Sequence, residues 1–320
     1  MSSTEAIGVD LGGTKMLVGV LDADSEVKFE SREASTGQTE EQLVELLVRE
    51  IDEARQARPG VATVGLGIPA TIDHDRGFAI SAVNLPIDNL PIRDLVGERT
   101  GLPIFVDNDA NVAALAEHLY GAARGADNAV MLTIGTGIGG GLILGGEIYR
   151  GATGAGAELG HVVIAMDGLP CQGNCPGHGC VETYASGTAL GREARAAAER
   201  EPDSAIGRMA SEGRTIDGRA VTETALAGDP TSIGVFDLVG SRLGVALTTF
   251  ANIFEPEVFV IGGGVMAAGD LLLDPARREL RERALPPMKE IPVLAAGMGP
   301  DAGMIGAAAL ARTELGQVGG

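Results

Sequence analysis

Two short strands joined by a glycine-rich turn occur twice in this chain, and the repetition constrains the fold more than any other feature. The first copy reads IGVDLGGTKMLVGV at residues 7–20, and the second reads VMLTIGTGIGGGLIL at residues 130–144. In each copy, strand-like apolar runs flank glycines, which tolerate positive φ and let a ligand approach the backbone closely. The pair predicts two related lobes, each contributing a phosphate-facing turn to one cleft.

The first turn carries a hydroxyl and a positive charge that suit an anion. Gly8, Gly13, Thr14 and Lys15 nearly match the P-loop pattern, but the last two stand in reverse order, and the strand-like run MLVGVLD follows where a P-loop needs a helix. We therefore expect a strand, a tight turn and a strand, with backbone N–H groups, Thr14 and Lys15 facing a phosphate. An ordinary hairpin without a ligand explains the same residues equally well.

The second turn also matches the letters of a dinucleotide-binding motif. Gly135, Gly137 and Gly140 fit Gly-x-Gly-x-x-Gly, and Glu158 follows at the distance expected of a ribose-binding acid. That motif opens a helix, however, whereas GLILGGEIYRGATG continues as a strand with further glycines. The sequence therefore disfavours an NAD-dependent enzyme.

The segment between the two turns alternates helices with strands. Residues 39–60 have apolar side chains at helical spacing, a Thr39/Gln42 capping pair at the start and Pro-Gly at the end. Residues 61–70 are typical of a buried strand, and residues 102–121 of a strand that runs into a helix. We expect an α/β protein whose lobes pack closely along a cleft.

Composition limits the kinds of partner. With 24 Lys and Arg against 44 Asp and Glu, the net charge is −20, which argues against nucleic acid, and the 3% aromatic content without tryptophan disfavours base stacking. The apolar stretch at 129–146 is rich in glycine and would be a poor membrane-spanning helix. No basic, apolar leader is apparent at the N-terminus, so we expect a cytoplasmic protein without a membrane partner.

Three polar residues, Asp107, Asn108 and Asp109, interrupt the run FVDNDANVAALAE just before its expected helix. Helix capping needs only one of them. Ligands of open α/β folds lie at the carboxyl ends of strands, and the helix dipole keeps a carboxylate at a helix N-terminus ionised. Such a carboxylate can accept a proton from a hydroxyl, and in phosphoryl transfer it chiefly orients the attacking oxygen. The segment is a candidate catalytic site.

All three cysteines lie in GHVVIAMDGLPCQGNCPGHGCVE at 160–182. Cys171, Cys175 and Cys180, with His161 upstream, supply the four ligands of a closed structural zinc site, although His178 is an alternative to His161. A disulfide with one thiol left over is disfavoured in a reducing cytoplasm. Because four protein ligands leave zinc no open position, we expect the metal to order this loop rather than to activate water.

Two acidic residues flank the cysteine loop, Glu158 at its entrance and Glu182 at its exit. A loop ordered by zinc would hold both carboxylates in place, where they suit the recognition of sugar hydroxyls. Taken singly, each could also be an ordinary surface acid, which is the less favoured interpretation.

With these motifs assembled, nearly the whole chain resembles the ROK family of sugar kinases (repressor, open reading frame, kinase) and, within it, the ATP-dependent glucokinases of bacteria. DLGGTK at 10–15 and GTGIGGG at 135–141 look like the family's two phosphate motifs, and DNDANVAALAE at 107–117 resembles its catalytic segment. ELGH at 158–161 and CPGHGCVE at 175–182 are similar to its sugar-and-zinc signature.

The resemblance implies the actin-like ATPase (ribonuclease H-like) fold, in which two α/β lobes flank a cleft, with a zinc-binding loop. The small lobe would comprise residues 1–118 and 304–320, with the first phosphate hairpin and the catalytic aspartate. The large lobe would comprise residues 119–303, with the second phosphate motif, the zinc loop and the nucleotide pocket. NIFEPEVFVIGGGV at 252–265 resembles the segment that ends at the adenosine pocket.

The resemblance implies a glucokinase that transfers the γ-phosphoryl group of ATP to O6 of glucose, giving glucose 6-phosphate and ADP. Asp109 would be the general base on the 6-hydroxyl, Asp10 would help hold Mg²⁺, and His161 would place one nitrogen on zinc and the other toward the sugar. The residues implied to bind the sugar are Asn84, Asn108, Asp109, Glu158, His161 and Glu182. Those implied for ATP and its magnesium are Asp10, Gly12, Gly13, Thr14, Lys15, Thr136, Gly137, Gly262, Gly263 and Gly264, and the implied zinc ligands are His161, Cys171, Cys175 and Cys180.

The chain departs from the family pattern at two places. Three residues separate Cys171 from Cys175, where the usual pattern has one, and Pro69-Ala70 stands where Pro-Gly is common. ROK repressors carry a helix-turn-helix before the first phosphate motif, whereas only nine residues precede Asp10 here. We therefore expect a kinase rather than a DNA-binding repressor.

Alternatives remain within and beyond the kinase interpretation. The acceptor could be mannose, fructose or N-acetylmannosamine, the donor could be polyphosphate, and the same pocket could serve a non-catalytic sugar sensor. The resemblance further implies a homodimer or a homotetramer.

Overall fold

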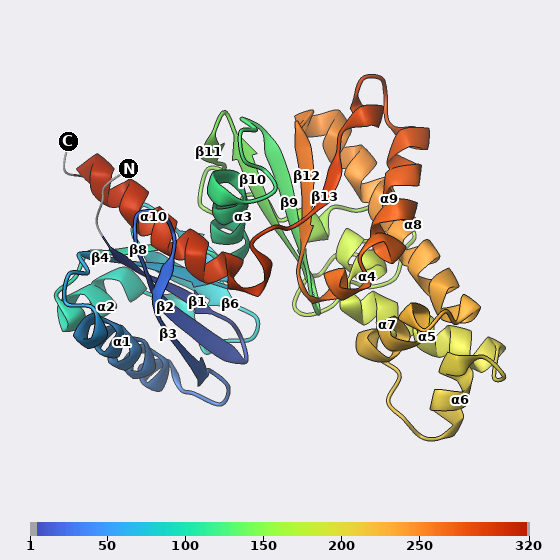
Figure 1. Cartoon of the computed structure of the whole chain (residues 1–320), viewed down its shortest axis with the longest axis horizontal. Helices are drawn as coiled ribbons and strands as arrows, with labels where there is room; N and C mark the ends of the chain where they lie inside the picture. The colour runs from blue at the N-terminus through green and yellow to red at the C-terminus, as the bar shows by residue number, and fades with distance from the viewer. Residues whose placement is uncertain (1–4, 319–320) are drawn as a thin grey trace. The chain divides into compact units, whose positions relative to one another are not determined.

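The computed structural model describes residues 5–318 of the chain, which folds into two compact units (Figure 1). Unit 1 consists of residues 1–125, 141–157 and 297–320, and unit 2 of residues 126–140 and 158–296. Residues 1–4 and 319–320, which belong to the expected small lobe, lie outside the described residues.

Unit 1 is built on a five-stranded sheet in which β3-β2-β1-β4-β8 is the strand order, beside a smaller sheet in the order β5-β6-β7. In the larger sheet β1 pairs antiparallel with β2 and parallel with β4, and β4 pairs parallel with β8. The elements described for this unit are β1 (Ala6–Leu11), β2 (Lys15–Leu21), β3 (Val27–Ala34), α1 (Glu40–Ala57), β4 (Thr63–Ile68), β5 (Ala70–Asp73), β6 (Phe78–Ala82), β7 (Asp88–Leu90), α2 (Ile92–Thr100), β8 (Ile104–Asn108), α3 (Asp109–Tyr120), β11 (Glu147–Ile148), the 3₁₀ turn η4 (Gly299–Asp301) and α10 (Ala302–Val318).

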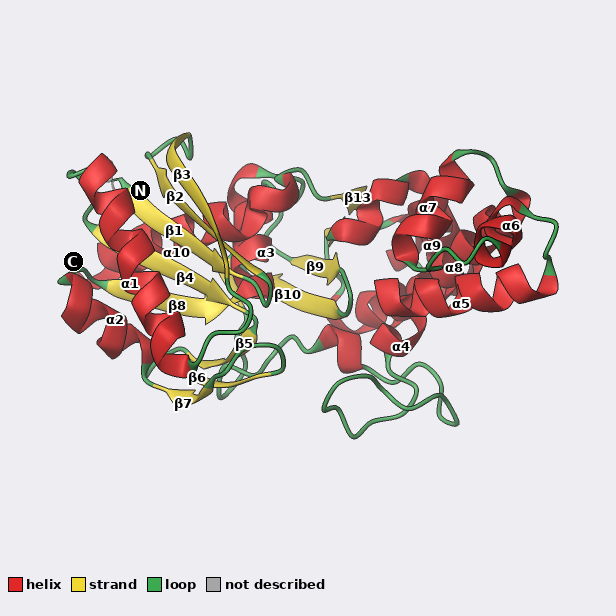
Figure 2. Cartoon of the chain, turned by 90° about the horizontal axis from the view of Figure 1, so that it is seen from below, coloured by secondary structure: helices red, strands yellow, loops and turns green. Residues whose placement is uncertain are grey.

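Alternate residues of β1 face opposite sides of the larger sheet. Ile7, Val9 and Leu11 belong to the core cluster that includes the apolar face of α1, whereas Ala6 packs with Met304 of α10. Figure 2 shows α1 and α2 on one face of this sheet and α10 on the other. Because successive side chains of a strand point to opposite faces, β1 contributes Ile7, Val9 and Leu11 to one layer of the core and Ala6 to the other.

Two strand glycines let α10 approach the sheet closely. A Cβ on Gly8 would overlap the carbonyl oxygen of Met304, and one on Gly65 would overlap that of Ala307. Gly8, which the sequence placed near the P-loop pattern, therefore serves helix packing.

The local predictions for this unit are confirmed. The Thr39 hydroxyl accepts a hydrogen bond from the Gln42 N–H, and the Gln42 side chain accepts one from the Thr39 N–H, which makes a capping box at the start of α1. β1 and β2 form an antiparallel hairpin in which Leu11 pairs with Met16. β8 runs directly into α3, and the α/β class holds for the described chain.

Unit 2 surrounds the remaining strands with helices. The second five-stranded sheet has the order β11-β10-β9-β12-β13, and β10 begins in unit 2 and continues into unit 1 at Gly141. The elements that complete the described chain are β9 (Ala129–Ile134), β10 (Ile138–Leu144), η1 (Leu159–His161), α4 (Val181–Ala185), α5 (Gly187–Arg200), α6 (Ala205–Ser211), α7 (Gly218–Leu226), α8 (Pro230–Phe254), β12 (Val258–Gly262), η2 (Gly264–Ala268), α9 (Asp270–Arg283), η3 (Met288–Glu290) and β13 (Val293–Ala295).

One segment of unit 1 lies in the sequence between the two segments of unit 2. Residues 141–157 belong to unit 1 rather than to the unit that contains the zinc loop. Gly141 lies against α3, where a Cβ would be 2.6 Å from that of Ala114, and a Cβ on Gly154 would overlap the carbonyl oxygen of Ile72. Close backbone packing of glycines therefore holds this segment on unit 1.

Helix α8 is long and apolar enough to span a membrane by length and composition. Half of its most apolar window is buried, however, and Phe236 and Phe250 are fully enclosed where α8 packs on α9, α5 and α4. We interpret α8 as a core helix of unit 2.

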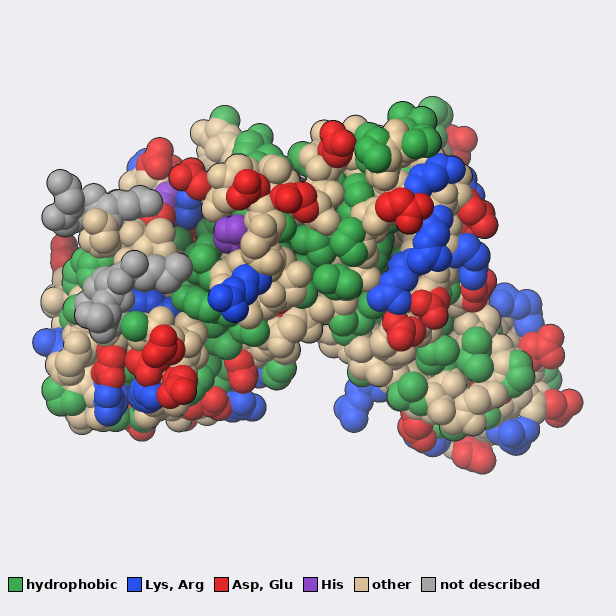
Figure 3. Space-filling view, turned by 45° about the horizontal axis from the view of Figure 1, so that its top comes forward, with side chains coloured by type: hydrophobic (Ala, Val, Ile, Leu, Met, Phe, Trp, Pro, Cys, Tyr) green, Lys and Arg blue, Asp and Glu red, His purple; other side chains and the backbone are tan. Residues whose placement is uncertain are grey.

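The basic side chains of α9 have acidic neighbours. Arg277 pairs with Asp270 and Asp274 at 2.7 and 2.9 Å, and Arg278 pairs with Asp237 of α8 at 2.9 Å. Figure 3 shows basic and acidic side chains interspersed over the face of the molecule that it draws.

Candidate active site

The first glycine turn is closed by its own backbone and held by a residue that follows β3. The Gly12 N–H donates to the Lys15 carbonyl oxygen at 2.9 Å, and the Ser35 hydroxyl donates to the Gly12 carbonyl oxygen at 2.6 Å. Gly13 faces Asn84, because a Cβ on Gly13 would lie 3.0 Å from the Cβ of Asn84. Unit 1 thus brings predicted phosphate-binding residues next to a predicted sugar-binding residue.

Asp10, near the end of β1, shares its surroundings with other charged groups. Burial, and then the negative charge of Asp109, raises the pKa of Asp10 to about 6. The positive charge of Lys15 lowers this pKa, and the negative charge of Asp301 raises it further. Lys15 and Thr14 are exposed at the turn. A divalent cation beside these carboxylates would offset their repulsion, and carboxylate oxygens are ligands that Mg²⁺ prefers. The donor set fits the expected magnesium.

The three polar residues at the junction of β8 and α3 have different roles. Asn108 is the N-cap, since its Oδ1 accepts hydrogen bonds from the N–H groups of Ala110 and Asn111 at 2.9 and 3.3 Å. Asp109 is the first residue of α3 and is half-buried, with its Oδ1 2.9 Å from the Ala110 nitrogen. Capping thus accounts for Asn108, and Asp109 lies at the positive end of the α3 dipole.

Asp107 is the centre of a charged network that sequence reasoning missed. Its Oδ2 lies 2.7 Å from the Arg150 Nε, and its Oδ1 accepts a hydrogen bond from the Asn111 amide at 2.8 Å. Glu314 of α10 lies 3.4 Å from both Arg150 Nη2 and His74 Nε2. These residues come from separate segments without a shared motif, so no local signal marks them.

The second glycine turn is tied to neighbouring side chains of unit 2. The carbonyl oxygen of Thr136 accepts hydrogen bonds from the Thr188 hydroxyl at 2.8 Å and from the Gln172 amide at 3.1 Å. The Ile138 N–H donates to Glu182 Oε2 at 2.8 Å. Glu182, a predicted sugar-binding residue, is buried. One of its carboxylate oxygens holds the backbone of the turn through this hydrogen bond.

Unit 2 contains a cavity of about 590 Å³ beside this turn. Gly135 and Thr136 line it together with the first turns of α5 and α7 and part of η2. The two helices begin here and are capped by Ser186 and Asp217. Arg195 and Arg219 add positive charge to the cavity lining, and Leu190 and Val265 offer apolar surface. The cavity can accommodate a ligand with an apolar ring and an anionic tail.

The three predicted nucleotide glycines have different positions relative to this cavity. Gly264 lines it, and a Cβ there would meet open space. Gly263 has φ of 90° and packs against the carbonyl oxygen of Ile134, while Gly262 packs between Met131 and Ala296. Gly137 adjoins the cavity wall at Thr136 without lining the cavity itself.

Sequence reasoning missed most of the cavity wall, including Thr188, Arg195 and Asp217. These residues belong to α5 and α7 or cap them. Ser186 and Asp217 precede helical segments and are typical N-caps, so a search for helix starts could have found both helix ends. No such signal shows that both helices begin at one cavity.

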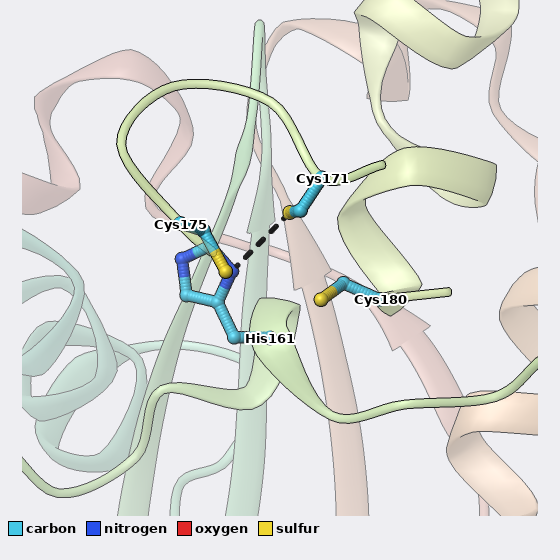
Figure 4. Close-up of side chains that lie close together, drawn as sticks. All are labelled: His161, Cys171, Cys175 and Cys180. Atoms are coloured by element: carbon cyan, nitrogen blue, oxygen red, sulfur yellow. Dashed lines mark hydrogen bonds between the residues drawn. The ribbon is translucent and has the colours of Figure 1, made fainter. Parts of the chain in front are cut away.

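The four predicted zinc ligands lie together in unit 2 (Figure 4). Their ligating atoms are all within 4.8 Å of one another, and His161 Nδ1 is 3.6 Å from Cys171 Sγ. A tetrahedral zinc site with ordinary bond lengths separates nitrogen and sulfur ligands by about 3.6 Å, so the donor set fits zinc. His178, the alternative ligand, is not part of this group.

The thiols of this cluster favour their protonated forms. Burial, together with the neighbouring sulfur atoms of Cys171 and Cys175, raises the pKa of Cys180 to about 12, and burial also raises the pKa of Cys171. A metal ion must therefore displace these protons to bind the thiolates.

The two ring nitrogens of His161 face different neighbours. Nδ1 faces the cysteines, whereas Nε2 lies 3.9 Å from Glu158 Oε2. Glu158 is exposed, with 59% of its side chain accessible. His161 thus links the metal cluster to a residue that the sequence predicts for sugar binding.

Comparison with known proteins gives a consistent result. A family model described as the ROK family matches residues 6–314. A glucokinase of Streptomyces coelicolor is 36% identical over 313 residues, covering 96% of this chain and 97% of its own, and a glucokinase of Thermotoga maritima is 35% identical over 319 residues, covering 99% and 100%. The solved structure of a ROK family glucokinase from Streptomyces griseus in complex with glucose and AMPPNP has a TM-score of 0.85 at 37% identity, covering 97% of this chain and 99% of that chain. The expected actin-like ATPase fold is thereby confirmed.

Proposed function

Since the chain belongs to the ROK family and is an ATP-dependent hexose kinase, we propose that it transfers the γ-phosphoryl group of ATP to O6 of glucose, giving glucose 6-phosphate and ADP. The similarity to glucokinases over nearly the whole chain supports glucose as the acceptor.

The observation that carries the proposal is the proximity of two carboxylates in unit 1. Asp10 of β1 pairs with Gly67 of β4, and a Cβ on Gly67 would lie 3.7 Å from the Cα of Asp109, the first residue of α3. The negative charge of Asp109 accordingly helps to raise the pKa of Asp10. Phosphoryl transfer needs a group that binds the cation on the phosphates close to a group that orients the attacking hydroxyl. The pair supports Asp10 in the first role and Asp109 in the second.

In this mechanism Asp109 accepts a hydrogen bond from the 6-hydroxyl of glucose and takes its proton as O6 bonds to the γ-phosphorus. The bond between the γ-phosphorus and the oxygen that bridges to the β-phosphate breaks, and ADP leaves. The α3 dipole keeps Asp109 ionised for this step. Mg²⁺, when bound near Asp10, neutralises charge on the phosphates.

The remaining substrate contacts are part of the same proposal. The residues proposed to hold the other sugar hydroxyls are Asn84, Asn108, Glu158, His161 and Glu182. Those proposed to surround the phosphates are Gly12, Gly13, Thr14, Lys15, Thr136 and Gly137. The cavity bordered by Gly264, Leu190 and Val265 supports binding of the nucleoside there, and Gly262 and Gly263 support the shape of that region from behind.

The metal cluster has a structural role in this proposal. His161, Cys171, Cys175 and Cys180 would hold zinc, which fixes the loop and supplies no reactive position, because all four ligands come from the protein. His161 would then present Nε2, and with it Glu158, to the sugar.

A panel of acceptors and donors tests the proposal. Release of ADP from MgATP is measured with glucose, mannose, fructose and N-acetylmannosamine, and formation of sugar phosphate is measured with polyphosphate as donor. We expect the highest kcat/KM with glucose and ATP. A higher kcat/KM with another hexose or with polyphosphate would contradict the assignment of substrate, and sugar binding without turnover by the zinc-loaded protein would indicate a sensor.

The cellular setting is part of the same proposal. Three free cysteines gathered around one histidine support a reducing compartment, and we propose the cytoplasm. We propose a homodimer or homotetramer, which light scattering on the purified protein distinguishes from a monomer.

A further inference from the structure

Gln172 lies between two of the predicted zinc ligands. It is one of the three residues that separate Cys171 from Cys175. Its side chain is half-buried, and its Nε2 donates a hydrogen bond to the Thr136 carbonyl oxygen at 3.1 Å. The residues between Cys171 and Cys175 therefore bring a side-chain amide from the cysteine loop to the second glycine turn.

The Thr136 carbonyl is fixed by two donors. The Thr188 hydroxyl, from the first turn of α5, donates to the same oxygen at 2.8 Å, so both acceptor positions of this carbonyl are used. In a trans peptide the N–H of the next residue points away from the carbonyl within one plane. Holding the Thr136 carbonyl therefore sets the direction of the Gly137 N–H.

The next peptide group is held from the same loop. The Ile138 N–H donates to Glu182 Oε2 at 2.8 Å, and Glu182 follows Cys180 by two positions. Side chains next to the metal ligands thus restrain the backbone on both sides of Gly137. The Gly137 carbonyl oxygen accepts a hydrogen bond from the Gly135 N–H at 2.9 Å, which closes the turn around this residue.

The turn also borders the nucleotide cavity of unit 2. Thr136 lines that cavity, and a Cβ on Gly137 would lie 3.7 Å from Gln172 Nε2. Backbone N–H groups in a glycine turn are suited to phosphate oxygens, provided that their direction is fixed before the ligand arrives.

We propose that Gln172 is a positioning residue for binding of the nucleotide, the phosphoryl donor. Its side chain couples the cysteine loop to the second glycine turn and directs the Gly137 N–H toward the phosphates of the nucleotide. The inference rests on the proposed function for the identity of the ligand. It extends that function by assigning a role in nucleotide binding to a residue of the loop that otherwise carries zinc ligands and sugar contacts.

The test compares Gln172→Met with the wild type. Methionine matches glutamine in length and volume but has no N–H donor, so packing is retained while the hydrogen bond is lost. Asn174→Ala is the matched control, because Asn174 is exposed in the same spacer. The readouts are the affinity for MgAMPPNP by calorimetry, the KM values for ATP and glucose, and the zinc content of the full-length protein.

We expect Gln172→Met to weaken MgAMPPNP binding and raise the KM for ATP by about fivefold, the effect of one lost hydrogen bond. The KM for glucose and the zinc content should match those of the wild type, and Asn174→Ala should match the wild type throughout. Unchanged MgAMPPNP affinity in Gln172→Met, an equal loss in Asn174→Ala, or loss of zinc from Gln172→Met would overturn the inference.

Calorimetry separates this inference from the proposed function. If the wild type binds MgAMPPNP and Gln172→Met weakens that binding, but no hexose is phosphorylated, the inference holds and the proposed function fails. If the wild type does not bind MgAMPPNP, the positioning role is contradicted as well.

Discussion

Asp107 and Arg150 form an ion pair in which the carboxylate Oδ2 lies 2.7 Å from the guanidinium Nε. The Asp107 side chain is only 2% exposed, and it immediately precedes the N-cap of α3. The pair therefore fixes the end of β8 from which Asp109 follows.

Removal of Arg150 should destabilise unit 1. Arg150→Met removes the guanidinium from the buried Asp107 carboxylate and leaves the more distant His74, whose Nδ1 lies 4.0 Å from Asp107 Oδ2, so we expect the free energy of unfolding to fall by roughly 3 kcal/mol. Chemical denaturation followed by circular dichroism measures this loss. The double variant Asp107→Asn/Arg150→Met should recover part of it, because no uncompensated charge remains, and a double variant less stable than Arg150→Met would contradict this account.

The contact between His74 and Glu314 should make stability depend on pH. A hydrogen bond with Glu314 raises the pKa of His74 above its ordinary 6.5, against the opposing effects of burial and Arg150, and the same bond lowers the pKa of Glu314 below its ordinary 4.5. The histidine contribution is complete below pH 6.5 and is lost as the pH rises through the raised pKa. The glutamate contribution is complete above pH 4.5 and is lost as the pH falls through the lowered pKa.

The variant His74→Gln should therefore lose more stability relative to the wild type near pH 6 than near pH 8.5. Melting temperatures of both proteins at the two pH values give the comparison. A difference that is constant, or larger at alkaline pH, would refute the assigned contact.

The sequence predicted the elements whose signals are local. The glycine hairpin of β1 and β2, the capping box of α1 and the four residues of the metal cluster each depend on neighbouring positions or on a rare residue type. Side-chain chemistry and spacing are sufficient in such cases.

Features formed by distant segments were not predictable in the same way. Arg150 reaches Asp107 from 43 positions away, and Thr188 and Asp217 line the same cavity of unit 2 from two different helix starts. Gly8 matches the first glycine of the P-loop pattern in sequence, but in the structure it packs against α10. Contacts of this kind depend on tertiary packing, which a single sequence does not encode in any local pattern.

The choice of histidine in the metal cluster can be tested directly. His161→Ala should weaken zinc binding by at least about tenfold, because loss of a residue that only hydrogen-bonds to a zinc ligand already lowers metal affinity by about that factor. His178→Ala should bind zinc as the wild type does. Competition with a chromophoric chelator measures both. Equal zinc affinity of the wild type and His161→Ala would show that another residue is the ligand.

Two adjacent glycines should respond differently to a side chain. Gly264→Leu projects into the open cavity, so we expect a folded protein whose MgAMPPNP affinity falls by at least about tenfold. Gly263→Ala should instead lower the free energy of unfolding by roughly 2 kcal/mol, because its φ of 90° disfavours a Cβ. Calorimetry and denaturation distinguish these results, and undiminished nucleotide affinity in Gly264→Leu would place the nucleotide elsewhere.

The role of Asp109 is the central claim, and the most direct measurement is glucose-dependent release of ADP from MgATP by Asp109→Asn, with glucose binding followed in parallel. Asparagine keeps the size of the side chain but cannot take the proton of the 6-hydroxyl. We expect kcat to fall by about 10³-fold while glucose still binds. A kcat close to that of the wild type would contradict the assignment of Asp109 as the general base.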